Sequence, residues 1–198
     1  MNKHRTISNN VELPEGYTLS CPGVAQAKWP KDDVSLPLRA QVESLREGLE
    51  ELKPLLSGHY AELSGHREHG YELVPNYREY LLRDDCGQIL YVTLRDGRKL
   101  VGYYVGFITR CLHYHALTLS SDIFYVLPNA RGMEGGSELL REVEREARRR
   151  GVDPCRMGFK AAHAAHMKTL LAANGYGPFE ITWIKWLAPP SEGTEIEV

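Results

Sequence analysis

Hydrophobic residues recur along this 198-residue chain with periods that change from helical to strand-like. Between residues 38 and 63, leucines stand three and four positions apart, which predicts helix. Pro54 lies inside this stretch, so we expect two helices or a kink there. A short helix is predicted over residues 75–83, begun by Pro75 or capped by Asn76.

Alternating apolar positions then predict strands over residues 89–94 and 100–110. Asp96-Gly97 lies between them, and Asp-Gly between apolar runs favours a tight hairpin. A third strand is predicted over 117–127, followed after Pro128-Asn129 by a helix over 135–150. Four apolar positions of this helix share one face and are expected to be buried: Leu139, Leu140, Val143 and Ala147.

The remaining pattern predicts a strand near 156–159, a helix over 162–173 and a last strand over 180–187. This order of elements favours an α/β domain built around one mixed sheet. The first 36 residues are rich in Pro, Gly, Asn and Asp. We therefore divide the chain into an N-terminal extension (1–36), one folded domain (37–188) and a flexible acidic tail (189–198).

Composition narrows the classes of function. A net charge of -2 and a pI near 6.5 argue against general nucleic-acid binding. No apolar run is long enough to span a bilayer, and the basic start has no apolar stretch behind it. The four cysteines are far apart, as in proteins of a reducing compartment. A cytoplasmic protein without a membrane partner is expected.

Candidate chemistry lies in the glycine-rich turn before the 135–150 helix. Backbone N–H groups at a helix N-terminus favour a phosphate or pyrophosphate, and Arg131 adds a positive charge there. Gly132, Gly135 and Gly136 would allow close approach of the backbone to such a ligand. The stretch contains neither G-x-x-x-x-G-K-[ST] nor G-x-G-x-x-G. The residues alone thus predict a phosphate-bearing ligand.

The segment 122–150 resembles the acetyl-CoA-binding segment of the GNAT superfamily of N-acetyltransferases. In that family a strand ending in Val-x-Pro is followed by [Arg/Gln]-x-x-Gly-x-[Gly/Ala] and an amphipathic helix. Val126, Pro128, Arg131 and Gly136 match these positions. The resemblance implies a mixed, mostly antiparallel central sheet flanked by helices.

This resemblance extends over about residues 45–187 and includes Gly175-Tyr176, where the family has Gly-Phe. It is closest to bacteriophage-encoded members, which carry a similar Leu-His-Tyr stretch before the strand aspartate, here 112–114. A place in the host cytoplasm would follow.

For function, the resemblance implies direct transfer of an acetyl group from acetyl-CoA, the cosubstrate, to a primary amine. Val126 and Leu127 would offer backbone groups to the pantetheine arm. The pyrophosphate would be held by residues of the turn and first helical turn: Arg131, Gly132, Met133, Glu134, Gly135, Gly136 and Ser137. The acceptor amine belongs to a small molecule, a protein or an amino-modified nucleobase, and a homodimer is one possible assembly.

The catalytic groups are less specified. Asp122 is a candidate general base, and His113 and His115 are alternatives expected to share one strand face. Leu171 stands where the family often has the tyrosine that protonates the CoA thiolate, so Tyr176 is a candidate replacement acid.

Two further features of the sequence bear on catalysis and on metal binding. Glu134 occupies the family's middle glycine position. With Leu171, it supports an alternative function: a non-catalytic module that acts through protein–protein contact, with or without bound CoA. The histidines at 59, 66, 69, 163 and 166 have no Cys or carboxylate at ligand spacing, so no metal site is expected.

Overall fold

The computed structural model describes residues 37–63, 66, 69–131 and 133–187. The N-terminal extension and the acidic tail therefore lie outside the described residues, as does Gly132.

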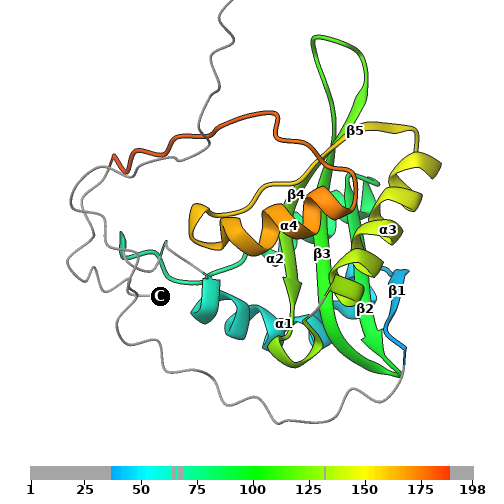
Figure 1. The fold of residues 1–198 in the computed structure, drawn as a ribbon, viewed down its shortest axis with the longest axis vertical. Coiled ribbons are helices and arrows are strands. Elements are labelled where there is room, and N and C mark those ends of the chain that lie inside the picture. Colours follow the sequence, from blue (N-terminus) through cyan, green and yellow to red (C-terminus); the bar gives the residue numbers. More distant parts are fainter. Residues whose placement is uncertain (1–36, 64–65, 67–68, 132, 188–198) are drawn as a thin grey trace, which may run out of the picture.

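A five-stranded mixed sheet forms the centre of the described domain (Figure 1), and its strands are β1 (Arg39–Val42), β2 (Ile89–Asp96), β3 (Lys99–Arg110), β4 (Leu117–Val126) and β5 (Val152–Arg156). The strands lie in sequence order. The first four pair antiparallel and β5 pairs parallel to β4, so the predicted mixed, mostly antiparallel sheet is confirmed.

Helices cover both faces of this sheet, namely α1 (Leu45–Leu63), α2 (Tyr77–Asp85), α3 (Met133–Arg149) and α4 (Ala164–Ala173), with short 3-10 turns η2 (Pro128–Ala130) and η3 (Ala161–His163). Gly48 of α1 lies against Tyr91 of β2, whereas Gly135 of α3 lies against Leu94 of the same strand. Because 91 and 94 differ in parity, α1 and α3 pack on opposite faces. Figure 1 shows α3 and α4 in front of the sheet.

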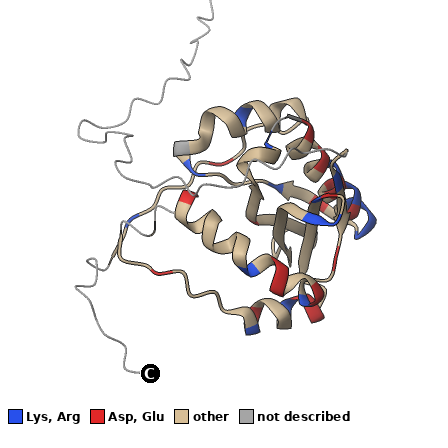
Figure 2. Cartoon of the chain, turned by 90° about the horizontal axis from the view of Figure 1, so that it is seen from below, with Lys and Arg blue, Asp and Glu red and all other residues tan. Residues whose placement is uncertain are grey.

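The core follows the predicted periodicity. The four apolar positions of α3 that were expected to be buried are between 0% and 2% exposed. On its outer face acidic and basic side chains pair along the helix, for example Glu144 with Arg148. Figure 2 shows both signs of charge interspersed over the domain. None of the helices in the described part of the chain is long and apolar enough to span a bilayer.

The helix predicted around Pro54 differs from the expectation of two helices or a kink. One helix, α1, runs through Pro54. Pro54 lies on the exposed face, so the carbonyl left without a helical N–H partner can bond to water. The helix also starts later than predicted, because residues 39–42 pair with β2 as β1 and Ser44 caps the first turn by accepting from the N–H of Glu47.

The last predicted strand, 180–187, is wrong. Residues 176–187 form no strand in the described structure, and Trp183 is 88% exposed. Trp186, near the end of this segment, stacks on His69 with ring centroids 4.1 Å apart and also contacts Tyr71. The end of the segment is therefore held beside residues 69–71, whereas its start contacts β5 through side chains, with Glu180 3.8 Å from Arg156. The β-branched and aromatic residues of this segment favour a strand, but a strand also needs a neighbouring strand with which to pair.

Candidate active site

An irregularity in β4 places Asp122. Ile123 pairs with Val105 and Ser121 with Gly106, so Asp122 is an extra residue with no partner on β3. Such a bulge bends the strand and redirects side chains. The exposed Asp122 carboxylate accepts a hydrogen bond from the Tyr80 hydroxyl of α2, with Oδ2 at 2.6 Å. Burial, and then this hydrogen bond, raises the pKa of Tyr80, so Tyr80 stays protonated and donates.

Beyond this bulge β4 and β5 separate. The two strands pair from Leu117↔Val152 to Ser120↔Arg156, and no pairing continues beyond that within the described residues. The chain after β5 touches β4 once more, where the N–H of Gly158 donates to the Ser121 hydroxyl at 2.8 Å. The second half of β4 therefore has an open edge on the β5 side.

The residues at the end of β4 differ in what their backbone offers. The N–H of Leu127 donates to Val101 of β3 at 2.8 Å, and its carbonyl accepts from Ala130. Val126 faces the other edge, because successive residues of a strand direct their backbone groups to opposite sides. Its carbonyl accepts from Arg131 Nε at 2.9 Å. Of the two residues expected to bind pantetheine, only Val126 therefore directs backbone groups to the open edge.

Arg131 lies between β4 and α3, as the sequence predicted. Its guanidinium pairs with Glu62 near the end of α1, with Nη2 2.5 Å from Oε1. It also lies over the ring of Tyr125, 5.6 Å from the centroid, and the Tyr125 hydroxyl donates to the other oxygen of Glu62 at 3.0 Å. The Arg131 guanidinium is thus paired with a carboxylate of the protein.

The glycines at the start of α3 have a packing role. A Cβ on Gly135 would lie 3.0 Å from the carbonyl oxygen of Ala130 and from Leu38. A Cβ on Gly136 would lie 2.9 Å from the side chain of Leu170 on α4. These glycines allow α3 to approach η2, the sheet and α4 closely.

The other residues of the predicted phosphate site lie in the first turns of α3. Met133 is the first residue of the helix. Glu134 is exposed and lines a shallow surface hollow together with Glu138 and Arg141, on the outer side of the helix. The Ser137 hydroxyl accepts from Asn174 Nδ2 at 2.9 Å, which ties the start of α3 to the end of α4.

A histidine that the sequence analysis considered only as a metal ligand, His59, lies next to the Arg131–Glu62 pair. His59 of α1 stacks on Tyr125, with ring centroids 4.5 Å apart, and its Nδ1 lies 2.9 Å from the Tyr103 hydroxyl. Burial, and then the nearby positive charge of Lys160, lowers the pKa of His59 to about 4. The ring is therefore neutral near pH 7.

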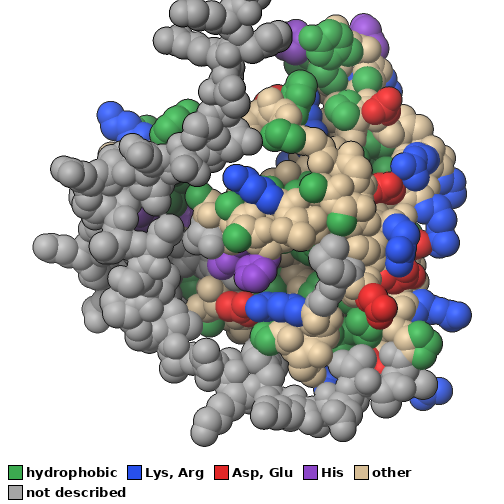
Figure 3. Space-filling model, in the orientation of Figure 1, with side chains coloured by type: hydrophobic (Ala, Val, Ile, Leu, Met, Phe, Trp, Pro, Cys, Tyr) green, Lys and Arg blue, Asp and Glu red, His purple; other side chains and the backbone are tan. Residues whose placement is uncertain are grey.

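Titratable side chains from three parts of the chain lie close together around His59: Glu62, Arg131, and Lys160 with His163. Burial lowers the pKa of His163 in η3 and of Lys160 just before it. Glu62 raises the pKa of His163, while Lys160 and Arg131 lower it. Figure 3 shows histidine side chains beside acidic and basic ones between α4 and α1. The described residues contain no group of three His, Cys, Asp or Glu side chains that could hold a metal ion.

The alternative bases lie elsewhere. His113 and His115 are exposed residues of the loop between β3 and β4, so they do not share a strand face as expected. Figure 1 shows this loop projecting beyond the sheet. From His115 to Asp122 the chain runs seven residues, or about 20 Å of extended strand. The structure therefore does not bring these histidines to Asp122.

Tyr176, the candidate replacement acid, lies over β5. Its hydroxyl donates to Cys155 Sγ at 3.7 Å, and burial raises its pKa. Leu171 is 6% exposed, and its carbonyl accepts from the N–H groups of Asn174 and Tyr176. The buried side chain of Leu171 thus packs in the domain and its carbonyl caps the end of α4, while Tyr176 packs on β5.

Three residues of the site were not assigned to it from the sequence: His59, considered only as a metal ligand, Glu62 and Tyr80. Each acts through a partner 42 or more positions away along the chain. His59 and Glu62 stand three positions apart on one helix. This spacing predicts that they share a helix face, but it does not predict which residues of other elements they contact.

A comparison with protein-family models matches residues 49–169 to the acetyltransferase (GNAT) family. A search of curated proteins gives no significant match. Among solved structures, the chain is similar to an aminoglycoside acetyltransferase, meta-AAC0020, from an uncultured soil metagenomic sample in complex with sisomicin. That match has a TM-score of 0.61 and 8% identity and covers 77% of this chain and 97% of the other.

A ribosomal-protein-alanine N-acetyltransferase from Brucella melitensis biovar Abortus 2308 is similar with a TM-score of 0.57 and 15% identity, covering 75% of this chain and 99% of the other. An integron cassette protein, HFX_CASS3, from the mobile metagenome of Cole Harbour Salt Marsh has a TM-score of 0.55 and 22% identity, covering 78% and 92%. At these identities the structures show the fold alone. The family model spans more than half of the chain, and the protein therefore belongs to the GNAT acetyltransferase family.

Proposed function

We propose that the protein is an acetyl-CoA-dependent N-acetyltransferase that transfers an acetyl group directly to a primary amine. The observation that carries this proposal is the arrangement along one strand. Asp122 lies on the bulge of β4, the open edge follows it, and the N-terminus of α3 with Arg131 lies beyond the strand end. Asp122 and Val126 are four residues apart, or about 13 Å.

Acetyl-CoA would lie along this open edge. Its pyrophosphate would be held at the start of α3, where backbone N–H groups and the helix dipole favour negative charge and Arg131 adds a cation. The pantetheine arm would pair with the backbone of Val126. The thioester would then lie near the bulge, where Asp122 and Tyr80 meet.

The chemistry asked of these residues is a direct displacement. The amine nitrogen attacks the thioester carbon, the carbon–sulfur bond breaks, and Asp122 accepts the proton lost by the amine, directly or through water. Leu171 offers no proton to the leaving thiolate, and the Tyr176 hydroxyl is bonded to Cys155. We therefore propose that solvent protonates the CoA sulfur.

The segment 176–187 supports a homodimer as the assembly. Five of its apolar side chains are at least two-thirds exposed: Phe179, Ile181, Trp183, Ile184 and Leu187. In the same chain β5 is an edge strand of the sheet. The aromatic ones, Phe179 and Trp183, would bury about 150–250 Å² each, and with the three aliphatic side chains they would supply a large part of the roughly 800 Å² per partner of a stable interface. Sedimentation of wild type and Trp183→Ser tests this. A wild-type monomer would contradict it.

A non-catalytic module is the second candidate, favoured by Leu171 at the acid position and by the occupied guanidinium of Arg131. Release of CoA thiol from acetyl-CoA, with a panel of primary amines, separates the two. We expect amine-dependent release that Arg131→Ala reduces. Acetyl-CoA binding by calorimetry without release for any amine would favour the module, and absence of both would overturn the proposal.

Two further properties of the protein stay predictions from the sequence. They are membership of a bacteriophage-encoded branch, based on the Leu-His-Tyr stretch 112–114, and with it a place in the host cytoplasm.

A further inference from the structure

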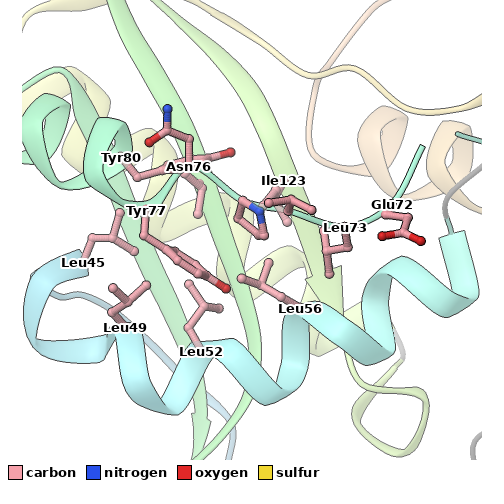
Figure 4. A pocket seen from close by; sticks show the side chains of 13 residues that line it. Leu45, Leu49, Leu52, Leu56, Glu72, Leu73, Asn76, Tyr77, Tyr80 and Ile123 are labelled. Carbon is pink, nitrogen blue, oxygen red and sulfur yellow. The ribbon is translucent and has the colours of Figure 1, made fainter. Parts of the chain in front are cut away.

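An apolar cavity of about 320 Å³ lies between α1, the segment 72–77 and the sheet. Figure 4 shows four leucines of α1 along one side of it: Leu45, Leu49, Leu52 and Leu56. Val105 of β3 and Ile123 of β4 line it from the sheet, and Leu73 and Val74 line it from the opposite segment. The wall is therefore mainly apolar, with polar groups contributed by Glu72, Asn76, Tyr77 and Tyr80.

Two residues of the cavity lining, Tyr80 and Ile123, lie next to the candidate base Asp122, which does not itself line the cavity. Tyr80 lines it, and the Tyr80 hydroxyl holds Asp122 at 2.6 Å. Ile123, also in the lining, directly follows Asp122 on the bulge. Glu72 contributes a second, exposed carboxylate to the lining. A molecule with a hydrocarbon body in the cavity would thus carry its polar end towards negative charge.

We propose, on the basis of the function proposed above, that the acceptor is a primary amine with an aliphatic or arylalkyl body that occupies this leucine-lined cavity. The ammonium group would be attracted by Asp122 and Glu72, while the hydrocarbon would replace water against the leucines. A polyhydroxylated amine is disfavoured, because most of the lining is apolar and would not replace the hydrogen bonds that its hydroxyl groups lose with water.

The experiment uses n-alkylamines from ethylamine to octylamine, 2-phenylethylamine, and glucosamine as the polar amine. With acetyl-CoA fixed, kcat/KM is expected to rise about fourfold per added methylene until the cavity is filled. Glucosamine is expected to be a poor substrate. Leu73→Asp places a charge in the lining and should flatten the dependence on chain length. Leu82→Asp alters a comparably exposed leucine of α2 outside the lining and should leave that dependence unchanged.

A second readout does not need turnover. The thermal stabilisation given by each amine alone should rise with chain length in the wild type and in Leu82→Asp, but not in Leu73→Asp. That pattern without acetyl transfer would uphold the cavity as an amine site and contradict the proposed function. Turnover with no dependence on chain length, or with glucosamine as good a substrate as octylamine, would overturn the inference and leave the proposed function standing. Absence of any length-dependent stabilisation or turnover would also overturn it.

Discussion

Arg131, in the turn before α3, forms an ion pair with Glu62 of α1, in which Nη2 lies 2.5 Å from Oε1. Glu62 is further held by the Tyr125 hydroxyl at 3.0 Å. The cation expected to hold a pyrophosphate is thus paired with a carboxylate of the protein. A phosphate ligand would have to displace Glu62 or share Arg131 with it.

Glu62→Gln should therefore strengthen acetyl-CoA binding. The substitution removes the competing charge, while the amide oxygen can still accept from Tyr125. Both partners are partly exposed, and such pairs contribute roughly 0.2–1 kcal/mol, so we expect a gain of between about 1.4-fold and fivefold in affinity by calorimetry. Glu138→Gln, which removes the pair with Arg141 on α3, is the control. Weaker binding in Glu62→Gln would show that Glu62 positions Arg131 for the ligand.

The two glycines of α3 should respond differently to alanine. Alanine favours a helix over glycine by up to about 1 kcal/mol. The Cβ of Gly135→Ala would meet the backbone carbonyl of Ala130, which cannot move aside, so we expect a net loss of about 1 kcal/mol. The Cβ of Gly136→Ala would meet the end of the Leu170 side chain, which can rotate, so the change should stay within about 0.5 kcal/mol. Urea unfolding measures both. Equal losses would contradict this assignment.

Protonation of His59 should destabilise the fold. Its pKa is lowered to about 4, below the value near 6.5 expected in the unfolded chain. The unfolded state therefore takes up the proton first. Stability from this residue is complete above about pH 6.5 and is lost as the pH falls towards about 4, by up to about 3 kcal/mol. His59→Gln should lose less stability over this window than wild type. The control is His113→Gln, an exposed histidine, which should match wild type.

The Asp122–Tyr80 pair should matter for rate more than for stability, because Asp122 is exposed. Asp122→Asn is expected to lower kcat/KM by about 10²- to 10⁴-fold, the usual contribution of a general base. Tyr80→Phe keeps the ring that stacks on Phe107 and removes only the donor, so its loss should be smaller. Steady-state assays between about pH 6 and pH 9 would show the losses. Undiminished activity in Asp122→Asn would remove Asp122 from the mechanism.

Much of this fold follows from local pattern. The apolar face of α3 and the hairpin at Asp96-Gly97 were predictable, because periodicity and turn chemistry act over a few residues. The failures are long-range. β1 pairs with β2, 47 or more positions along the chain, while residues 176–187 form no strand in the described structure and Trp186 packs on His69.

The residues of the site likewise fall into those that local sequence predicts and those that depend on long-range contacts. The turn with Arg131 and the position of Asp122 on β4 were found from the order of residues. The bulge that sets Asp122 apart depends on pairing with β3. His59, Glu62 and Tyr80 join the site through contacts between separate elements, which no single-sequence pattern contains. His113 and His115 were misplaced although the predicted strands, 100–110 and 117–127, agree closely with β3 and β4. Both residues lie in the loop between these strands, where a shared strand face has no meaning.

The most direct test of the central proposal follows the acetyl group itself. Wild type would be incubated with acetyl-CoA carrying a deuterated acetyl group and with octylamine, and both the amine and the intact protein would be weighed by mass spectrometry. Direct transfer predicts labelled N-acetyl-octylamine, free CoA and an unlabelled protein, with product reduced in Arg131→Ala and in Asp122→Asn. Label fixed on the protein, or no labelled product from this or any other primary amine while acetyl-CoA binds, would contradict the account.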